Sequence, residues 1–582
     1  MALRRTARHR RLARVNDEND SRPAPEEELT AGLPPPDDIA PDDPLPSGRR
    51  LSRDSRMLGL ACVGLGVVLR TVQLGRREVF GDEFATLSAI STPALALWPS
   101  PESAMEPLLP LYHAAARWWM SFHDIAARPL SDLTPAGGIA GREWLLRVPS
   151  AVFGAAALAM FYRHAGRYLR GTAFVVAMVF AALNPTLVQA AMDATPVALL
   201  ALAVVMAHHF GVRALDEGGR WPWLVWGVST AVGLLAHPAF WALTASQCAF
   251  AAFRKKSPKP VAAGARIGLG LCAAVALQAG WLLSRRFTPN APVIDDGLRG
   301  LVSAALGDFE RHGTPQFTRA IMYLLVLLGL ALALAFHRVR TLEASAVPSH
   351  VGFIDQTQDV VGTWRGLSLA SYLGYQWTTC LGPVLLVMVA GGLNPRLHIG
   401  PAHLIPALPA LAVLLGTGLD FIPRAGGKAI PGAMLVVLMG WYDFQTLRDP
   451  GYGVKRAFGT IREMKFAADR DMVVFSGTKS LAAPLGVYSS TAYPSIGVRT
   501  PETSAEATAA RDRVTSATAG KARVFAILHD DLYEVEKRRF ASGVRDALTP
   551  ERGWTPVELK GGDRFRILSP WAGTELRVYT RR

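Results

Sequence analysis

Long apolar runs recur between residues 57 and 444 of this chain, separated by mostly short polar connections. A helix needs about 20 apolar residues to cross a bilayer, and about eleven runs come near that length. The pattern therefore predicts a polytopic α-helical membrane protein. The predicted spans are Met57–Leu74, Leu146–Tyr162, Thr172–Ala190, Pro196–Val212, Trp223–Ala236, Ala239–Phe253, Ala263–Leu283, Ala320–Phe336, Ala370–Gly391, His403–Ile422 and Ala429–Phe444.

After Phe444 the pattern changes to short strand-like runs that alternate with amphipathic segments. Such alternation predicts a small α/β domain at 447–582, after a membrane domain at 57–446. The C-terminal part has no phosphate-binding glycine pattern and no serine-centred elbow, so we assign it no chemistry. Its predicted helices are Tyr452–Asp469, Ser504–Thr518 and Asp531–Leu548, and its predicted strands are Met472–Phe475, Arg523–Leu528, Val557–Lys560, Phe565–Leu568 and Leu576–Thr580.

The first 56 residues are polar, with an arginine-rich stretch at Arg4–Arg14 and a proline- and acid-rich run at Arg22–Gly48. Such a composition cannot build a core, and no cleavable signal peptide precedes the first span. We predict a disordered cytoplasmic tail at 1–56. The arginines just before the first span should hold this end inside: Arg49, Arg50, Arg53 and Arg56.

Basic connections fall on one side of the membrane if the spans alternate as predicted and residues 106–122 do not cross. This segment carries Arg117 between apolar residues, followed by Trp118 and Trp119, which are typical membrane-surface anchors. We therefore predict an interfacial helix at Glu106–Phe122 within one long external loop, 75–144. An odd number of spans then places the C-terminal domain outside a plasma or inner membrane.

Composition agrees with this interpretation. Half of the 582 residues are hydrophobic, and the mean hydropathy is +0.20, which is high for a soluble protein of this size. The net charge of +15 comes from lysines and arginines between apolar runs, so topology explains it better than nucleic-acid binding does. The four cysteines all lie in apolar segments and are interpreted as packing residues: Cys62, Cys248, Cys272 and Cys380.

The acidic pair Asp82 and Glu83 follows the first span by a few residues, which places two carboxylates where the bilayer meets water. A carboxylate there can act as a base on a water-borne acceptor, while a lipid-linked reactant arrives from the membrane. The plain alternative is a solvated acidic loop.

Several further segments, taken with this pair, resemble the GT-C fold glycosyltransferases, in the branch that contains protein O-mannosyltransferases and bacterial enzymes that use polyprenyl phosphate sugars. The likeness extends over residues 57–444, and the soluble end resembles the external domains of some bacterial members. The matching segments are Asp82-Glu83, Leu109-Pro110-Leu111-Tyr112, Leu146-Arg147-Val148-Pro149-Ser150-Ala151-Val152-Phe153-Gly154, Asn184-Pro185 and Leu404-Ile405-Pro406-Ala407-Leu408-Pro409.

This resemblance implies that Asp82 is the catalytic base and that Glu83 orients either Asp82 or the acceptor. The implied donor is a polyprenyl phosphate sugar in a groove between helices, among membrane lipids. The acceptor is left open among protein, glycan and lipid, and no nucleic acid is expected. We assign no certain cofactor, and a divalent metal is left open.

The chain departs from the family at two positions. Thr195 stands where members often have the arginine of Glu-Ala-Arg-Pro-Tyr, and Ala402 stands where they have an arginine before a late Leu-Leu-Pro. Both arginines would suit a lipid phosphate. Arg396, His398 and His403 lie in the same predicted external turn as Ala402 and are either substitutes for them or interfacial anchors.

Three more residues are candidates for substrate contacts, each with a structural alternative. Asp193 either helps to place the acceptor or is a hydrogen-bonded turn residue. His237 either contacts substrate or caps a turn, and Glu106 is either a cavity carboxylate or a helix-start acid.

Two other classes of protein fit part of the pattern. A transporter or flippase of lipid-linked sugars would also need many spans, but the sequence lacks matched glycine- or proline-broken helices in two repeated halves. A non-catalytic scaffold descended from transferases would explain the two missing arginines.

Overall fold

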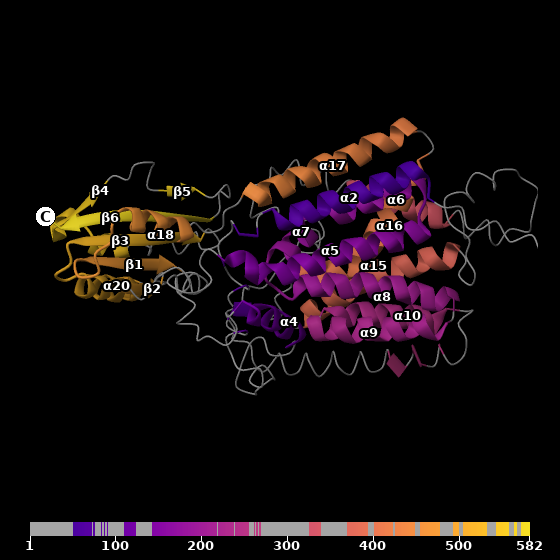
Figure 1. Cartoon of the computed structure of the whole chain (residues 1–582), viewed down its shortest axis with the longest axis horizontal. Coiled ribbons are helices and arrows are strands. Elements are labelled where there is room, and N and C mark those ends of the chain that lie inside the picture. The colour runs from indigo at the N-terminus through magenta and orange to yellow at the C-terminus, as the bar shows by residue number, and fades with distance from the viewer. Residues whose placement is uncertain are drawn as a thin grey trace, which may run out of the picture. The chain divides into compact units, whose positions relative to one another are not determined.

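The computed structural model is shown in Figure 1, and every described residue lies in the unit Leu51–Arg582. The helical part and the C-terminal sheet are treated separately below. The described residues are 51–72, 74–75, 79, 83, 86–87, 90, 110–123, 142–217, 219–237, 239–254, 261, 264–265, 267–268, 325–338, 369–393, 401–422, 425–448, 454–477, 493–499, 504–531, 543–557, 564–566 and 572–581.

In the described part of the chain before residue 449, apolar helices pack side by side (Figure 1). Alanine, leucine and valine fill the core between them, with Phe174, Phe180 and Phe240 fully buried. The helices are α2 (Arg53–Thr71), α4 (Pro110–Ser121), α5 (Glu143–Tyr168), α6 (Gly171–Leu183), α7 (Pro185–Met192), α8 (Val197–Glu217), α9 (Arg220–Ala236), α10 (Phe240–Phe253), Leu325–Arg338, α15 (Leu369–Leu393), the 3-10 helix η3 (Pro401–Ala407), α16 (Leu408–Asp420) and α17 (Ala425–Arg448).

Most of the predicted spans coincide with these helices, whereas Ala263–Leu283 lies largely outside the described residues. Within the described residues, three helical segments are long and apolar enough to cross a membrane: α5, α8 and His403–Asp420. The bent pair α6 and α7 makes a fourth if it counts as one span. These helices fit a helical membrane protein, and the total of eleven spans stays a prediction.

Helix α2 begins before the predicted start of the first span. The hydroxyl oxygen of Ser52 accepts a hydrogen bond of 3.1 Å from the backbone N–H of Ser55, which caps the helix at this point. Arg53 and Arg56, expected in the polar tail, therefore lie in the first turns of α2. At the other end of the helical part, α17 runs to Arg448, two residues beyond the expected boundary.

A proline breaks the third predicted span into α6 and α7, which meet at an angle of 42°. Pro185 has no N–H, so the carbonyl of Ala181 loses the donor that a continuous helix would supply. Arg70 of α2 supplies donors instead, with hydrogen bonds of 3.1 Å to the carbonyls of Ala181 and Ala182. The side chain of Asn184 caps the start of α7. A buried arginine thus stabilises the bend.

Helix α4 packs against α5, and a side chain of α4 supplies a hydrogen-bond donor that a proline removes from α5. Pro149 lies inside α5 and leaves the carbonyl of Leu145 without its helical donor. The indole N–H of Trp119 in α4 donates to that carbonyl at 2.9 Å. Trp118, on the same helix, is 66% exposed, as an interfacial anchor would be.

The C-terminal part contains a six-stranded mixed sheet with strand order β2-β1-β3-β6-β4, and β5 pairs with β6. Strands β1, β2 and β3 are parallel, and β6 runs antiparallel to its neighbours. The strands are β1 (Asp471–Gly477), β2 (Ser495–Arg499), β3 (Arg523–Asp531), β4 (Trp554–Val557), β5 (Arg564–Arg566) and β6 (Ala572–Arg581), and the helices are α18 (Val454–Glu463), α20 (Ser504–Ala517) and α21 (Gly543–Ala547), with the 3-10 helix η5 (Pro550–Arg552).

Alternating side chains of the central strands enter two separate cores on the two faces of the sheet. Phe525 and Ile527 of β3 belong to the core that contains Phe458 of α18. Val524 and Ala526 belong to the core that contains residues of α20 and α21. Coverage on both faces explains why these strands are almost continuously apolar.

Several details of the C-terminal part differ from the prediction. Strand β4 ends at Val557, where the predicted strand Val557–Lys560 begins, and α18 ends at Glu463, before the predicted end at Asp469. Strand β2 was missed, because it is short and has a glycine in its middle. The predicted helix Asp531–Leu548 starts too early, since β3 continues to Asp531 and pairs there with Ala572 of β6.

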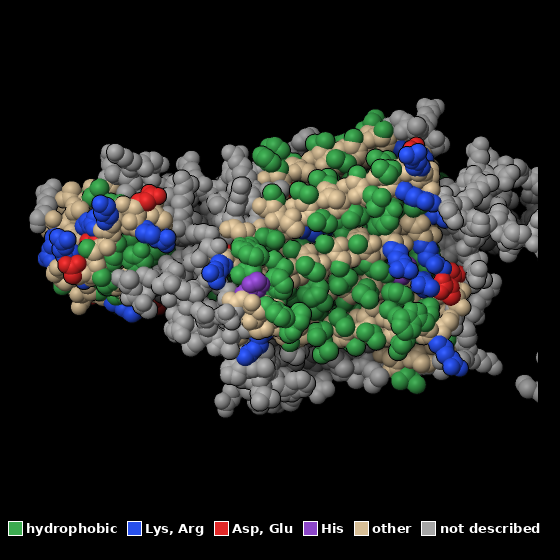
Figure 2. Space-filling view, in the orientation of Figure 1, with side chains coloured by type: hydrophobic (Ala, Val, Ile, Leu, Met, Phe, Trp, Pro, Cys, Tyr) green, Lys and Arg blue, Asp and Glu red, His purple; other side chains and the backbone are tan. Residues whose placement is uncertain are grey.

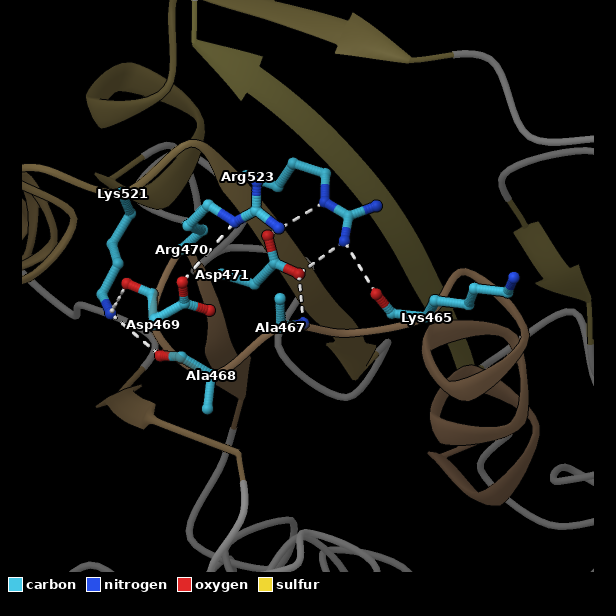
Figure 3. Close-up of polar contacts among 8 residues, drawn as sticks. All are labelled: Lys465, Ala467, Ala468, Asp469, Arg470, Asp471, Lys521 and Arg523. Carbon is cyan, nitrogen blue, oxygen red and sulfur yellow. Dashed lines mark hydrogen bonds and ion pairs between the residues drawn. The ribbon is translucent and has the colours of Figure 1, made fainter.

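A polar cluster fastens the start of β1 to the start of β3 (Figure 3). Asp471 is 1% exposed and its carboxylate accepts hydrogen bonds of 2.9 and 2.5 Å from Arg523. The same carboxylate accepts from the backbone N–H of Ala467, and Arg523 also donates to the carbonyls of Met464 and Lys465. All of these partners are backbone or buried groups, so the cluster is a structural fastening.

Candidate functional site

The structure describes half of the predicted site residues. Asp82, which the sequence predicts as the base, is not among them. The described ones are Glu83, Asp193, His237 and His403, and the ones outside the described residues are Asp82, Glu106, Arg396 and His398.

Glu83 forms a two-point ion pair with Arg147 of α5. The Nε of Arg147 donates to Oε1 of Glu83 at 2.7 Å, and Nη2 donates to Oε2 at 2.7 Å. The side chains of Arg147 and Glu83 are 0% and 1% exposed. Paired N–H···O bonds between a planar guanidinium and a carboxylate fix direction as well as distance. The orientation of Glu83 is therefore set by α5.

Two backbone contacts complete this arrangement. Nη1 of Arg147 donates to the carbonyl of Leu74, just beyond α2, at 2.8 Å. The backbone N–H of Ala194, in the turn between α7 and α8, donates to Oε1 of Glu83 at 2.8 Å. One buried ion pair thus joins the end of α2, the start of α5, the α7–α8 turn and the segment that begins at Glu83.

A second chain of hydrogen bonds runs beside the ion pair, through Tyr112, Ser150 and Thr195. The hydroxyls of Tyr112 and Ser150 lie 2.7 Å apart, and the Ser150 hydroxyl donates to the carbonyl of Thr195 at 3.4 Å. Because Ser150 has one proton to give, Tyr112 is the donor to Ser150. Burial raises the pKa of Tyr112, and the charges of Glu83 and Asp193 add to that rise, so the phenol keeps its proton.

His113 extends the contact between α4 and the segment after Glu83. Its Nε2 lies 3.4 Å from the hydroxyl of Thr86, and both residues are buried. Burial lowers the pKa of His113, which keeps the imidazole neutral. Helix α4 therefore contacts both α5 and the segment that carries Glu83.

Asp193 ends α7 and makes a tight turn. Its N–H donates to the carbonyl of Gln189 at 3.0 Å, and its own carbonyl accepts from the N–H of Thr195 at 2.8 Å. The side chain is 8% exposed. This is the hydrogen-bonded turn that the sequence allowed as an alternative, and it places the Asp193 carboxylate near Tyr112.

His237 and His403 come from distant parts of the sequence and meet in the structure. Their rings lie 5.2 Å apart at 76°. Nδ1 of His237 accepts from the N–H of Ala239 at 3.1 Å, so the residue caps the turn between α9 and α10. Partial burial, together with the nearby His403, lowers the pKa of His237 to about 3, and its ring is neutral at pH 7.

No metal site is evident in the described part of the chain, where no three His, Cys, Asp or Glu side chains gather as metal ligands. Glu83 already has guanidinium and backbone donors on its oxygens.

The segments that carry the family resemblance contain Tyr112, Arg147 and Ser150, but the resemblance implies no role for these three residues. The signal was present in Arg147, a charged residue at the start of an otherwise apolar run, since such residues are expensive in a membrane and usually have a partner. Glu83 lies 64 positions before Arg147 in the chain, so no local sequence pattern indicates that these two residues form a pair.

Comparison with known proteins confirms the resemblance expected from the sequence. Residues 139–281 match the family described as dolichyl-phosphate-mannose-protein mannosyltransferase. The matched region contains Arg147, Asp193, Ala194 and His237. No curated protein matches the chain.

Solved structures of GT-C glycosyltransferases show distant similarity. ArnT from Cupriavidus metallidurans bound to undecaprenyl phosphate is 13% identical, with 88% of this chain and 97% of that chain covered and a TM-score of 0.37. The oligosaccharyltransferase of Archaeoglobus fulgidus is 14% identical, with 81% and 68% covered and a TM-score of 0.43. Arabinofuranosyltransferase AftD from Mycobacteria is 16% identical, with 91% and 42% covered and a TM-score of 0.42.

Proposed function

We propose that this chain is an integral membrane glycosyltransferase that moves a sugar from a polyprenyl phosphate donor to an acceptor at the external face of the membrane. Asp82 is the general base and Glu83 positions it. The acceptor is a protein, a glycan or a lipid.

The observation that carries this proposal is the fixed carboxylate of Glu83. Arg147 and Ala194 occupy its oxygens and hold it in one orientation, so Glu83 is a positioning residue. Asp82 precedes Glu83 directly in the chain, and we therefore assign the base to the residue next to this fixed carboxylate. A base works only when it is held within hydrogen-bond reach of the proton that it takes.

The reaction follows from this arrangement. An acceptor hydroxyl oxygen forms a bond to the anomeric carbon of the sugar, while the bond from that carbon to the donor phosphate breaks. The hydroxyl proton goes to Asp82, and the electron pair leaves with the polyprenyl phosphate. The departing phosphate needs positive groups or hydrogen-bond donors.

Thr195, which replaces a family arginine, supplies no cation: it is buried and its carbonyl accepts from Ser150. We assign phosphate contacts to Arg396, His398 and His403 instead. We assign Asp193 and His237 to the acceptor side, together with Glu106, which precedes the start of α4 by four residues in the sequence.

The proposed topology has about eleven spans, with residues 1–56 in the cytoplasm and residues 447–582 outside, where they select or present the acceptor. This arrangement puts Asp82 and the C-terminal sheet in the same compartment.

The test is sugar transfer in membranes that contain the wild-type chain or its Asp82→Asn variant, with a panel of radiolabelled polyprenyl phosphate sugars. The proposal expects transfer by the wild type and a loss of at least a hundredfold in the variant at equal expression. The matched control is Asp54→Asn, an exposed acid in the first turn of α2. Equal transfer by Asp82→Asn would remove Asp82 as the base, and no transfer by the wild type would favour the scaffold or transporter interpretations.

A further inference from the structure

A groove lies at the end of the helical part that is far from Glu83. It encloses about 500 Å³ between α8, α9, α10, α15 and the four residues Val261, Gly264, Ala265 and Gly268. Its walls are mostly apolar, and it falls in the range of about 300–1,000 Å³ that is usual for ligand sites. The residues used below are Gly211, Leu215, Trp223, Trp226, Ala251 and Gly264.

The three helices α8, α9 and α10 run alternately up and down, which fixes where the groove lies. The break between α8 and α9 follows Glu217, and α9 returns to His237 before α10 begins. The end of α8, the start of α9 and the end of α10 are therefore at one level. Gly211 and Leu215, Trp223, and Ala251 lie near those three termini, so the groove opens at that level.

This level is in the opposite half of the membrane from the proposed transfer site. Ala194, which donates to Glu83, lies at the start of α8, and Gly211 lies 14 residues beyond Val197. At about 1.5 Å per residue this separation is about 21 Å along the helix. The hydrocarbon core is about 30 Å thick, so each leaflet covers about half of it. A lipid whose phosphate reaches the transfer site belongs to the other leaflet.

Arginines stand at the level where the groove opens. Arg220 precedes Trp223 by one helical turn, and Arg254 follows Ala251 by one turn, so both residues belong to that level of the helices. Further arginines stand at the same end of the helical part, where they outnumber the acids, and Figure 2 shows the blue side chains gathered there. They are Arg163, Arg167, Arg170 and Arg213, with the acids Asp216 and Glu217.

Tryptophans mark the membrane surface at this level. Trp221 is 65% exposed, and Trp223 and Trp226 line the groove. Indole rings collect where hydrocarbon meets headgroups. The groove is apolar, and arginines stand at the level of its opening. A phospholipid suits both features, because its acyl chain can fill the apolar groove and its phosphate can pair with the arginines.

We propose that this groove binds one anionic phospholipid from the leaflet at the arginine end, with an acyl chain between α8, α9 and α10 and the phosphate at Arg220 and Arg254. The position of this leaflet opposite the transfer site rests on the proposed function, whereas the binding of the lipid in the groove does not.

The test uses the full chain, delipidated in mild detergent and reconstituted in nanodiscs of phosphatidylcholine with 10% phosphatidylglycerol, with retained lipid counted by native mass spectrometry. We expect one phosphatidylglycerol per chain. A Cβ at Gly264 meets no atom within 4 Å, so Gly264→Phe fills the groove and should lower retention at least tenfold. Gly227→Phe is the matched control, because Gly227 has equal space but does not line the groove.

Variants of the two arginines test the contact with the lipid headgroup separately from the contact with its acyl chain. Arg220→Gln and Arg254→Gln should each weaken retention of phosphatidylglycerol about fivefold, whereas Arg53→Gln, an exposed arginine of α2, should leave it unchanged. Equal retention of phosphatidylcholine and phosphatidylglycerol would overturn the proposal. So would equal retention by Gly264→Phe and Gly227→Phe, or displacement of the lipid by added polyprenyl phosphate.

If Gly264→Phe does not fold, tryptophan quenching by phosphatidylglycerol with brominated acyl chains decides the question. Quenching that saturates at low mole fraction and falls in Trp223→Phe supports the site. Quenching that only rises in proportion to the brominated lipid, as from bulk bilayer, contradicts it.

Discussion

The guanidinium of Arg147 and the carboxylate of Glu83 face each other in a two-point ion pair, with both bonds at 2.7 Å and both side chains almost fully buried. Burial of two charges costs about as much as their attraction returns, so such a pair is weak evidence for stability by itself. Its value here is geometric. It fixes the carboxylate of Glu83 against α5 and the α7–α8 turn.

Breaking this pair from one side should be costly. In Arg147→Leu the Glu83 carboxylate stays buried without its cation, and we expect a loss of about 3–5 kcal/mol in the free energy of unfolding. The double variant Glu83→Leu/Arg147→Leu should recover part of that loss but not sugar transfer. Thermal unfolding in detergent and the transfer assay measure the two effects. Arg142→Leu, at the exposed start of α5, is the control; an Arg147→Leu variant as stable as this control would contradict the prediction.

The hydroxyl of Tyr112 should be worth about 1 kcal/mol of stability, since Tyr112→Phe removes its bond to Ser150 but leaves the ring packed. Ser150 keeps its bond to the carbonyl of Thr195. Chemical denaturation of purified protein compares this variant with Tyr162→Phe, at a partly buried tyrosine of α5. A loss no larger than that of the control would show that the hydrogen bond contributes nothing.

Arg70 should be far more sensitive to substitution than Asp443, a buried acid in α17. In Arg70→Met the carbonyls of Ala181 and Ala182 lose their donors at the α6–α7 bend. We expect about 2–4 kcal/mol of destabilisation, measured as thermal unfolding in detergent. Asp443→Asn should cost clearly less, because Arg70 keeps its hydrogen bonds to the carbonyls of Gly66, Ala181 and Ala182. Equal losses in the two variants would contradict this order.

Acid should destabilise the fold through His237. Its pKa is about 3 in the folded chain and about 6.5 when exposed, so below pH 6.5 the unfolded chain binds a proton that the folded chain does not. Stability from the neutral ring is complete above pH 6.5 and decreases as the pH falls from 6.5 toward 3. We expect a loss of about 1–2 kcal/mol between pH 6.5 and pH 5.

The check on His237 is the melting temperature as a function of pH for the wild type and His237→Gln, in which the side chain does not titrate. The wild type should show the steeper decline in this window. Parallel curves would mean that His237 is not the group responsible.

The variant Arg523→Gln tests how much the hydrogen bonds between Arg523 and Asp471 stabilise the C-terminal sheet. Asp471 would lose both hydrogen bonds from Arg523 and keep the one from Ala467, at a cost of about 2–3 kcal/mol. Arg511→Gln breaks an exposed pair with Asp512 and should stay within about 0.5 kcal/mol of the wild type. Urea unfolding followed by circular dichroism of the full chain compares them, and similar midpoints would contradict the prediction.

Much of the helical part is predictable from the sequence, because a helix in lipid satisfies its own backbone and must present about 20 apolar residues, which is a local and countable signal. The runs at 146–162 and 196–212 became α5 and α8 for this reason. The central strands β1, β3 and β6 were equally visible as short apolar runs, whereas β2 and the length of β3 depend on pairing with other strands.

From the sequence by itself we predicted the acidic pair Asp82 and Glu83 a few residues after the first span. Only the tertiary structure decided which groups bind the Glu83 carboxylate, because Arg147 and Ala194 lie 64 and 111 positions away in the chain. It likewise brought His237 next to His403 and Arg70 to the bend at Pro185. Apolar periodicity is a property of neighbouring residues, whereas the pairing of buried charges depends on which helices pack together, and no local pattern records that choice.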